Sequence, residues 1–587
     1  MAALLFSVAL YELPYVLTLE KTGWTAIPPV VEADQMLYLN LSAIHNASAT
    51  EVVNPWYGDL VSKVDVPHLR FPITFLLFRF THFIFGSWTL AILVWAAVWA
   101  ALTFAAAAFC VDSLFPDAKP RSTFVTATAL LVLQSPLIYL AEIRHLPSTV
   151  GFFELHLPYL RFAIPQVTVP FVLAYLGLQA RVLKSASKWF LGGMAALQFA
   201  VCATFPYFLP VLAIGTAITL LIGKLPREKI ALSWPTILGF GAICGFLDFG
   251  YLFLGGLGVS HGNVQFAPHF RPAMIIPCVR PFVIVLVIAA GLAWVSHASL
   301  AARTTVAGLA LSNAVFGFSD VFFSPEAQIL DHPHYLIALT TWLPLLVFMR
   351  SVLENSDSRA LRAGLASALI LTGAWEGFAS FHSRVQSNLI QAAALSEFNR
   401  LSLSNKDLIV APAQFADDLS SWVPVVSHAK VLFTPDGENI LSAAETRSEQ
   451  PFRQSAYLAL AGMNVDTLTS VTQHDGSRFR FDPLLQQGDR GYQRSPLATD
   501  RERARSLVKE RLSPLLAMLN ADPAVARRLF AGFDRIVVID SSSQPFFDPN
   551  ALSRWFQIDR AYEKDRVRVW ICHFTEGLVQ QAKKVNR

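Results

Sequence analysis

The chain has 587 residues, of which 54% are hydrophobic and only 15% are charged. Its mean hydropathy of +0.45 is far above that of a soluble domain, so the composition excludes an ordinary water-soluble globular protein. The formal net charge of +4 is too small for this length to indicate a nucleic-acid partner. The sequence therefore predicts a protein that lives in a lipid bilayer.

Apolar stretches recur along the first two thirds of the chain. A bilayer requires roughly 20 apolar residues for each helical span. On that measure we expect about eleven transmembrane helices, at residues 3–19, 86–112, 123–142, 166–181, 189–206, 207–223, 232–256, 273–296, 304–322, 335–350 and 361–378.

The positive charge falls on every second connection between these spans. One set of loops holds Lys119, Arg121, Arg181, Lys184, Lys188, Lys224, Arg227, Lys229, Arg303, Arg350, Arg359 and Arg362. The short loops of the other set hold only Arg144, Arg161 and Arg271. Because Lys and Arg in short loops stay on the cytoplasmic side, the N-terminus is predicted inside and the C-terminal third outside. We expect a bacterial inner membrane, with the C-terminal domain on the periplasmic side.

The first outer loop, residues 20–85, is too long for a simple connector and is only half polar. It contains the apolar run Met36 to Leu39 and a longer run from Phe71 to Phe85. Such stretches are typical of amphipathic helices that lie along the membrane surface. The second outer segment, 143–165, has a similar composition and is broken by prolines. The two segments together are predicted to roof a cavity at the outer face.

The composition changes sharply near residue 380 and becomes charged and mixed. Strand-like runs at 407–410, 430–433 and 535–539 alternate with helical stretches, which favours a small α/β domain with a partly parallel sheet. The run 566–571 alternates polar and apolar residues and predicts a half-exposed strand near the sheet edge. The predicted organisation is a membrane module, 1–378, and an extracytoplasmic α/β domain, 379–587.

Two carboxylates stand directly after the first span, in Glu32-Ala33-Asp34, just before the apolar run Met36 to Leu39. On an extended segment, side chains two residues apart point the same way, so this pair is suited to hold a cation or to act on a substrate hydroxyl. The alternative is structural, because Asp34 is also well placed to cap an amphipathic helix at its N-terminus.

An outer loop that follows the first span and carries an acidic Glu-x-Asp pair with amphipathic helices resembles the GT-C superfamily of integral membrane glycosyltransferases. The segment Asn54 to Gly58, Asn-Pro-Trp-Tyr-Gly, also looks like the far end of that loop in uncharacterised bacterial members. The resemblance covers the architecture of residues 1–378 and, more loosely, the α/β tail. It implies transfer of a sugar from a polyprenyl-phosphate donor to an acceptor glycan, lipid or protein at the outer face.

Under this resemblance Asp34, with Glu32 beside it, is the expected catalytic base that takes the proton of the acceptor hydroxyl. The departing lipid phosphate requires positive charge, and guanidinium groups bind phosphate in a bidentate fork. The candidates for donor phosphate or substrate binding are Arg144, His145, Arg161, His269, Arg271 and Arg280. Glu142 matches in position a second-loop acid of the family, and a surface acid at headgroup level explains it equally well. Arg271 and Arg280 also fit snorkelling to the headgroups.

Two further groups of polar residues have alternative explanations. His332 and His334, in Asp-His-Pro-His-Tyr, have the ligand type of a metal site and are also suited to line a substrate cavity. Asp248 lies deep in the span 232–256, where it is expected to pair with Arg280 or to bind a ligand or proton. A divalent cation, Mg²⁺ or Mn²⁺, is a possible cofactor, although one Glu-x-Asp pair supplies too few ligands to hold it alone.

Two other classes of protein compete with the enzyme. A transporter or flippase has many spans and buried charges, but it predicts repeats, ionisable groups near the midplane and short loops. Here the acids and histidines gather at one face beneath large outer segments, which favours an enzyme. A noncatalytic membrane scaffold would retain the same topology.

Overall fold

A computed structural model describes most of the predicted membrane helices and most of the C-terminal third. The residues described are chiefly 51–58, 60–62, 72–117, 120–132, 166–224, 232–254, 270–278, 281–322, 336–354, 400–412, 419–434, 444–473, 497–542, 545–564 and 567–574, with isolated residues elsewhere. The predicted spans 3–19 and 361–378 lie almost entirely outside the described residues.

The chain divides into two compact units. The first comprises Met1–Pro14, Phe71–Gly86 and Leu90–Ser383, and the second comprises Tyr15–Arg70, Ser87–Thr89 and Arg384–Arg587. Most of the first outer loop is therefore grouped with the C-terminal third, although the two are separated by more than three hundred residues of sequence.

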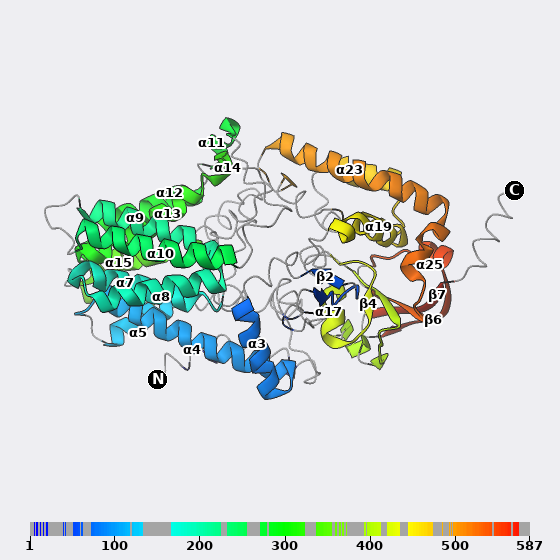
Figure 1. Cartoon of the computed structure of the whole chain (residues 1–587), viewed down its shortest axis with the longest axis horizontal. Coiled ribbons are helices and arrows are strands. Elements are labelled where there is room, and N and C mark those ends of the chain that lie inside the picture. The colour runs from blue at the N-terminus through cyan, green and yellow to red at the C-terminus, as the bar shows by residue number, and fades with distance from the viewer. Residues whose placement is uncertain are drawn as a thin grey trace. The chain divides into compact units, whose positions relative to one another are not determined.

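The first unit is helical throughout its described part, and its longer helices lie side by side (Figure 1). Its elements are α3 (Pro72–Phe85), α4 (Trp88–Leu114), α5 (Pro120–Val132), α7 (Val169–Ser185), α8 (Lys188–Thr204), the 3₁₀ turn η4 (Pro206–Phe208), α9 (Leu209–Lys224), α10 (Trp234–Leu254), η6 (Pro272–Met274), α11 (Ile275–Cys278), α12 (Pro281–Val295), α13 (Leu300–Phe316), α14 (Ser319–Phe322) and α15 (Ile337–Glu354).

Two helical stretches of the described chain, Trp88–Leu114 and Pro206–Lys224, are long and apolar enough to cross a membrane. Ile73–Phe85, Val283–Val295, Leu300–Phe316 and Ile337–Val352 are apolar but shorter. Membrane-spanning helices are thus present, and the expected number of about eleven stays a prediction.

Large apolar side chains are exposed on the described helices of this unit. On α10 the side chains of Leu238, Phe246 and Phe249 are 70%, 80% and 70% exposed, and on α3 Phe83 is 82% exposed. A soluble monomer rarely exposes apolar patches of this kind, whereas lipid-facing helices must. The α3 helix was predicted from sequence as amphipathic, and its exposed side is formed largely by apolar side chains.

Helices α9 and α13 cross at unusually close range because small residues line both. A Cβ atom added to Gly308 would lie 2.7 Å from the carbonyl oxygen of Gly215. The Thr219 hydroxyl donates to the Thr304 carbonyl at 3.1 Å, and the Ser312 hydroxyl donates to the Val211 carbonyl at 2.7 Å. Small residues that let backbones approach, together with interhelical hydroxyl bonds, are what stabilises helix pairs in lipid.

One predicted span is not the continuous helix that the sequence suggested. The stretch 304–322 ends its main helix at Phe316, where the Gly317 N–H bonds to the carbonyls of Asn313 and Ala314 before the short helix α14. A count of apolar residues does not detect this end of the helix. In the predicted span 273–296 the structure describes the end of η6, the one-turn helix α11 and the helix α12, and residues 279–280 between α11 and α12 lie outside the described residues.

The second unit contains a five-stranded mixed sheet with the order β4-β3-β5-β7-β6. Its elements are β1 (Glu51–Val53), β2 (Leu60–Ser62), β3 (Asp407–Val410), α17 (Leu419–Val426), β4 (Lys430–Val431), α19 (Ala444–Leu460), α20 (Val465–Gln473), α23 (Ala498–Ala521), η10 (Pro523–Ala526), α24 (Arg527–Phe530), β5 (Arg535–Ser541), α25 (Pro549–Trp555), β6 (Phe556–Lys564) and β7 (Val567–Phe574). Strands β3, β4 and β5 run parallel, and β7 pairs antiparallel with both β5 and β6.

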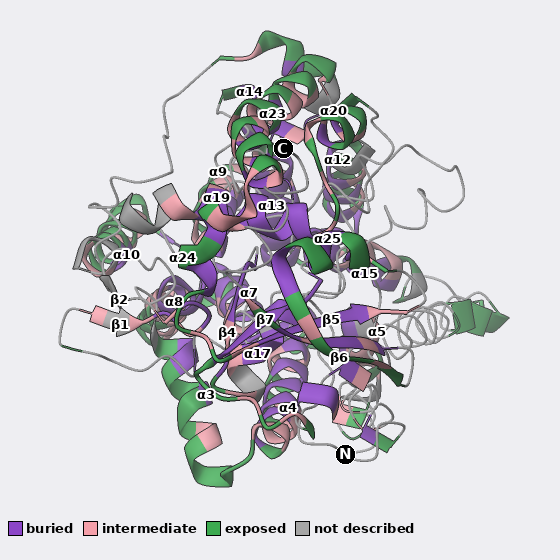
Figure 2. Cartoon of the chain, turned by 90° about the vertical axis from the view of Figure 1, so that its right-hand side faces the viewer, coloured by how far each residue is buried: buried purple, intermediate pink, exposed green. Residues whose placement is uncertain are grey.

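A partly parallel sheet was expected, and the C-terminal sheet domain confirms it. One strand was missed, because β6 lies at the sheet edge and its sequence is largely charged. The strand predicted near the edge at 566–571 is β7, which lies next to the edge strand β6, and four of its eight residues are buried while one is exposed (Figure 2). One face of the sheet carries a core formed with α19, α23 and α25, which includes Tyr457, Leu512 and Trp555.

Candidate functional site

Most of the residues predicted to act on substrate lie outside the described residues. These are Glu32, Asp34, Glu142, Arg144, His145, Arg161, His269, Arg280, His332 and His334. Their proposed roles therefore stay predictions. Of the features singled out from the sequence, the structure describes Arg271 in the first unit and, separately, the segment Asn54–Gly58 in the second.

Arg271 lies at the start of η6, half buried. Its backbone N–H donates to the carbonyl of Val321 in α14 at 2.7 Å, and the rings of Phe270 and Phe322 lie 6.1 Å apart beside it. The backbone of Arg271 is thus held where two short helical segments meet, and a role of its side chain in binding phosphate stays a prediction.

The far end of the first outer loop is a tight turn between β1 and β2. The Asn54 side-chain oxygen accepts hydrogen bonds from the backbone N–H groups of Trp56 at 2.9 Å and Tyr57 at 3.2 Å. Gly58 closes the turn with a φ of +83°, a conformation that favours glycine. A Cβ atom at Gly58 would lie 2.9 Å from the Cε atom of Lys430, but a lysine side chain can move, so the positive φ is the reason that favours glycine here.

This turn binds directly to the sheet of the C-terminal unit. The backbone N–H of Val431, in β4, donates to the carbonyl of Trp56 at 3.0 Å. The Tyr57 hydroxyl oxygen accepts from the Thr434 N–H at 3.2 Å and from the Gln450 side-chain amide at 3.3 Å. The Arg453 guanidinium lies 4.6 Å from the centre of the Tyr57 ring. The first outer loop is therefore anchored to β4 and α19, and we call Asn54–Gly58 the anchor turn.

Replacing Tyr57 by Phe is expected to cost about 1–2 kcal/mol of local stability, because the buried Thr434 N–H and Gln450 amide lose their acceptor while the ring stays over Arg453. Hydrogen exchange of the full chain should show amides of 54–58 exchanging roughly tenfold faster. Unchanged exchange in this segment would mean that the hydroxyl does not hold the turn on the sheet.

Asp540 lies near the carboxyl end of β5, where a carboxylate in an open α/β sheet either binds a ligand or forms a turn. It is 1% exposed, and its carboxylate accepts backbone N–H groups from Ser541 at 2.8 Å, Phe546 at 2.7 Å and Phe547 at 2.8 Å. These bonds fold the segment after β5 back on the strand, so the structural explanation holds. Burial raises the pKa of Asp540 to about 6, and the three N–H donors oppose that rise.

This pKa predicts a pH dependence with a definite sign. The folded unit holds the Asp540 proton more tightly than an ordinary aspartate of pKa 3.8 does, so stability falls as pH rises from 3.8 to about 6 and is constant above. Replacing Asp540 by Asn should remove that slope from the thermal unfolding of the second unit. A slope that survives in the variant would assign it to another group.

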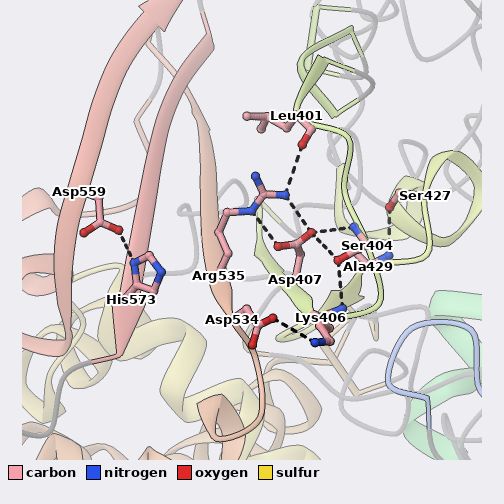
Figure 3. Close-up of polar contacts among 10 residues, drawn as sticks. All are labelled: Leu401, Ser404, Lys406, Asp407, Ser427, Ala429, Asp534, Arg535, Asp559 and His573. Carbon is pink, nitrogen blue, oxygen red and sulfur yellow. Dashed lines mark hydrogen bonds and ion pairs between the residues drawn. The ribbon is translucent and has the colours of Figure 1, made fainter.

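Two pairs of polar side chains join neighbouring strands of the sheet (Figure 3). Asp407 and Arg535 form an ion pair at the amino ends of β3 and β5, and Asp559 of β6 contacts His573 near the carboxyl end of β7. Among the described residues no group of three or more His, Cys, Asp or Glu side chains is arranged to hold a metal ion. The expected divalent cation therefore depends on residues that the structure does not describe.

No family model matches the sequence. No curated protein matches it either. The structure is similar to the crystal structure of ArnT from Cupriavidus metallidurans bound to undecaprenyl phosphate, with 11% sequence identity and a TM-score of 0.35 over 93% of this chain and 97% of that chain. The function is accordingly argued from the residues of this chain.

Proposed function

We propose that this chain is a membrane glycosyltransferase that moves a sugar from a polyprenyl-phosphate donor to an acceptor glycan, lipid or protein at the outer face of a bacterial inner membrane. The observation that carries the proposal is the attachment of the anchor turn to β4 and α19. It ties the loop that carries Glu32 and Asp34 to a folded α/β unit. Enzymes commonly hold their reactive loops on a rigid scaffold in this way, whereas transporters have short loops and little mass outside the membrane.

The proposed chemistry follows from the residue types. Asp34, with Glu32 beside it, takes the proton of the acceptor hydroxyl as that oxygen attacks the anomeric carbon of the donor sugar. A new carbon–oxygen bond forms on one face while the bond to the lipid phosphate breaks on the other, which inverts the anomeric centre. Arginine side chains, among them Arg271, neutralise the departing phosphate.

A divalent cation fits this scheme only in a supporting role. Mg²⁺ takes roughly six oxygen ligands, so the Glu32–Asp34 pair would share it with phosphate oxygens and water. When bound, such an ion would neutralise charge on the leaving phosphate. Activity that is unchanged after chelation would remove the cation from the proposal and leave the role of Asp34 intact.

The proposal is tested by measuring transfer from a panel of radiolabelled polyprenyl-phosphate sugars into a membrane extract, with wild type and Asp34→Asn at matched expression. Loss of a positioned general base should lower the rate about 100-fold. Asp112→Asn is the matched control, because Asp112 is a half-exposed residue paired with Arg181 at 3.0 Å and makes the same chemical change away from the loop. Transfer that survives in Asp34→Asn would remove Asp34 from the chemistry, and absence of transfer from every donor would count against the enzyme.

One observation favours a second candidate, a transporter or flippase of a lipid-linked or small polar substrate. Asp248 lies buried in the helix bundle, where transporters place ionisable groups. This alternative predicts movement of a lipid-linked substrate across vesicle membranes without formation of a new glycosidic bond.

A further inference from the structure

A carboxylic acid is buried among four helices of the first unit. Asp248 lies on α10, which covers the predicted span 232–256, and it is 5% exposed. Its Oδ2 atom accepts a hydrogen bond from the side-chain amide of Gln198 on α8 at 2.7 Å. Its Oδ1 atom is fully buried and has no hydrogen-bond partner among the described residues.

The groups around this carboxyl are polar but uncharged. The Tyr175 hydroxyl of α7 lies 2.8 Å from the Thr216 hydroxyl of α9 and donates to the Gln198 carbonyl oxygen at 3.4 Å. The Cys202 thiol of α8 donates to the backbone carbonyl of Asp248 at 3.9 Å. Tyrosine and cysteine ordinarily titrate near pH 10 and 8.5, so both are neutral at pH 7.

No described Lys, Arg or His side chain pairs with Asp248. The ion pair with Arg280 that the sequence suggested cannot be examined, because Arg280 lies outside the described residues. The described donors near the carboxyl, the Gln198 amide and the Cys202 thiol, are both neutral, and Oδ1 has no described hydrogen-bond partner. An ionised carboxylate has two oxygens that each require donors or a cation.

Burial affects the two protonation states of this carboxyl differently. The ionised form would bury a charge that has no described counter-ion, which is costly inside a helix bundle. The neutral form keeps the bond from Gln198 to Oδ2 and leaves only Oδ1 without a described partner. The surroundings therefore disfavour the ionised form relative to the neutral one.

We propose that Asp248 is a proton-binding site within the helix bundle, whose carboxyl group holds a proton at neutral pH beside Gln198. A sodium ion fits the site less well, because hard cations take several oxygen ligands and the neighbouring donors include an N–H and a thiol. The inference is independent of the glycosyltransferase proposal, since it uses only the packing of α7, α8, α9 and α10.

Proton release from this site has a structural consequence. Helices α8 and α10 contact each other at Gln198 and Asp248, and a charge created there has no described cation to neutralise it. Among the described residues, deprotonation would therefore leave a buried charge that only water or a cation entering between α8 and α10 could neutralise.

The test is infrared spectroscopy of the purified full-length protein in lipid nanodiscs at pH 7, comparing wild type with Asp248→Asn. The expected difference spectrum loses the carbonyl band of a protonated carboxylic acid. The control, Asp112→Asn, should lose a carboxylate band instead, because Asp112 is half exposed and paired with Arg181. A difference spectrum for Asp248→Asn that contains only carboxylate bands overturns the proposal.

A second measurement needs no variant, in case Asp248→Asn fails to fold. Dicyclohexylcarbodiimide modifies protonated carboxyl groups in apolar surroundings, and mass spectrometry of the α10 peptide locates the adduct. Modification of Asp248 at pH 7 that is equal in sodium chloride and choline chloride supports the proton site. Protection by sodium chloride would identify a sodium site and overturn it, as would an unmodified Asp248 at pH 7.

Discussion

Replacing Asp407 by Asn is expected to lower the free energy of unfolding of the second unit by about 3–5 kcal/mol. The Arg535 guanidinium donates to Asp407 through Nε at 2.7 Å and through Nη2 at 2.9 Å, one bond to each carboxylate oxygen. Asp407 is 4% exposed, and Ser404 donates to the same carboxylate through its N–H at 2.6 Å (Figure 3). Removing the negative charge leaves a largely buried guanidinium without its counter-ion, which costs more than the pair contributes.

The neighbouring pair Lys406–Asp534 provides a matched control, because each of its residues directly precedes one residue of the buried pair. Its side chains are 69% and 70% exposed and 3.4 Å apart, so Lys406→Ala should cost less than about 1 kcal/mol. Native-state hydrogen exchange of the full-length protein at β3 and β5 measures both changes. Equal losses in the two variants would mean that the buried pair does not hold the strands.

A double variant separates the loss of the pair from the cost of the orphaned charge. Asp407→Leu combined with Arg535→Met removes both charges and should recover most of the lost stability, because apolar replacements of buried pairs are often neutral. Burial alone would raise the pKa of Asp407, but hydrogen bonds from Arg535 and Ser404 lower it below its ordinary value. The pair therefore stabilises the unit fully above pH 3.8, and that contribution is lost as pH falls through the lowered pKa.

The parts of the fold that could be predicted are those that follow from local patterns. Long apolar runs located α4, α8, α9 and α10, and the break at Pro206 separated the two adjacent spans as expected. Buried β-branched runs located β3 and β5 for the same reason, because a central parallel strand is apolar on both faces.

The parts that could not be predicted depend on contacts between distant residues. Strand β6 carries Asp559, Arg560 and Glu563, and it is extended because it pairs with β7 along nearly its whole length. The bond between Tyr57 and Thr434 joins residues 377 positions apart. The local hydrophobic pattern indicates neither the pairing of β6 nor the contact of Tyr57. The only signal for that contact in the sequence was an aromatic pair, Trp56 and Tyr57, in a half-polar loop.

For the candidate site, the sequence predicted more residues than the structure describes. Residue types and loop position suggested Asp34, Glu32 and the phosphate-binding arginines, and of these the structure describes Arg271. What the structure added is the anchor turn, which ties the acidic loop to the α/β unit. It also gave Asp248 a described partner, the neutral side chain of Gln198, while the predicted pair with Arg280 stays a prediction.

Replacing Gly308 by Ala is expected to destabilise the helix bundle by about 3 kcal/mol, the upper end of the usual cost of overpacking. The added methyl group would lie 2.1 Å from the Thr219 hydroxyl, 2.7 Å from the Gly215 carbonyl oxygen and 3.0 Å from the Thr219 backbone nitrogen. The hydroxyl can rotate away, but the backbone atoms cannot. Helices α9 and α13 must therefore move apart, which also weakens the bond from Thr219 to the Thr304 carbonyl.

The same chemical change at Gly291 of α12 is the matched control, because a Cβ atom there meets nothing within 4 Å. Alanine is the better helix former by about 0.5–1 kcal/mol, so Gly291→Ala should be neutral or slightly stabilising in thermal unfolding of the detergent-solubilised protein. The two variants are thus expected to shift the unfolding temperature in opposite directions. A stabilising Gly308→Ala would contradict the close crossing, because intrinsic helix propensity prevails only where the neighbouring helix leaves room for a methyl group.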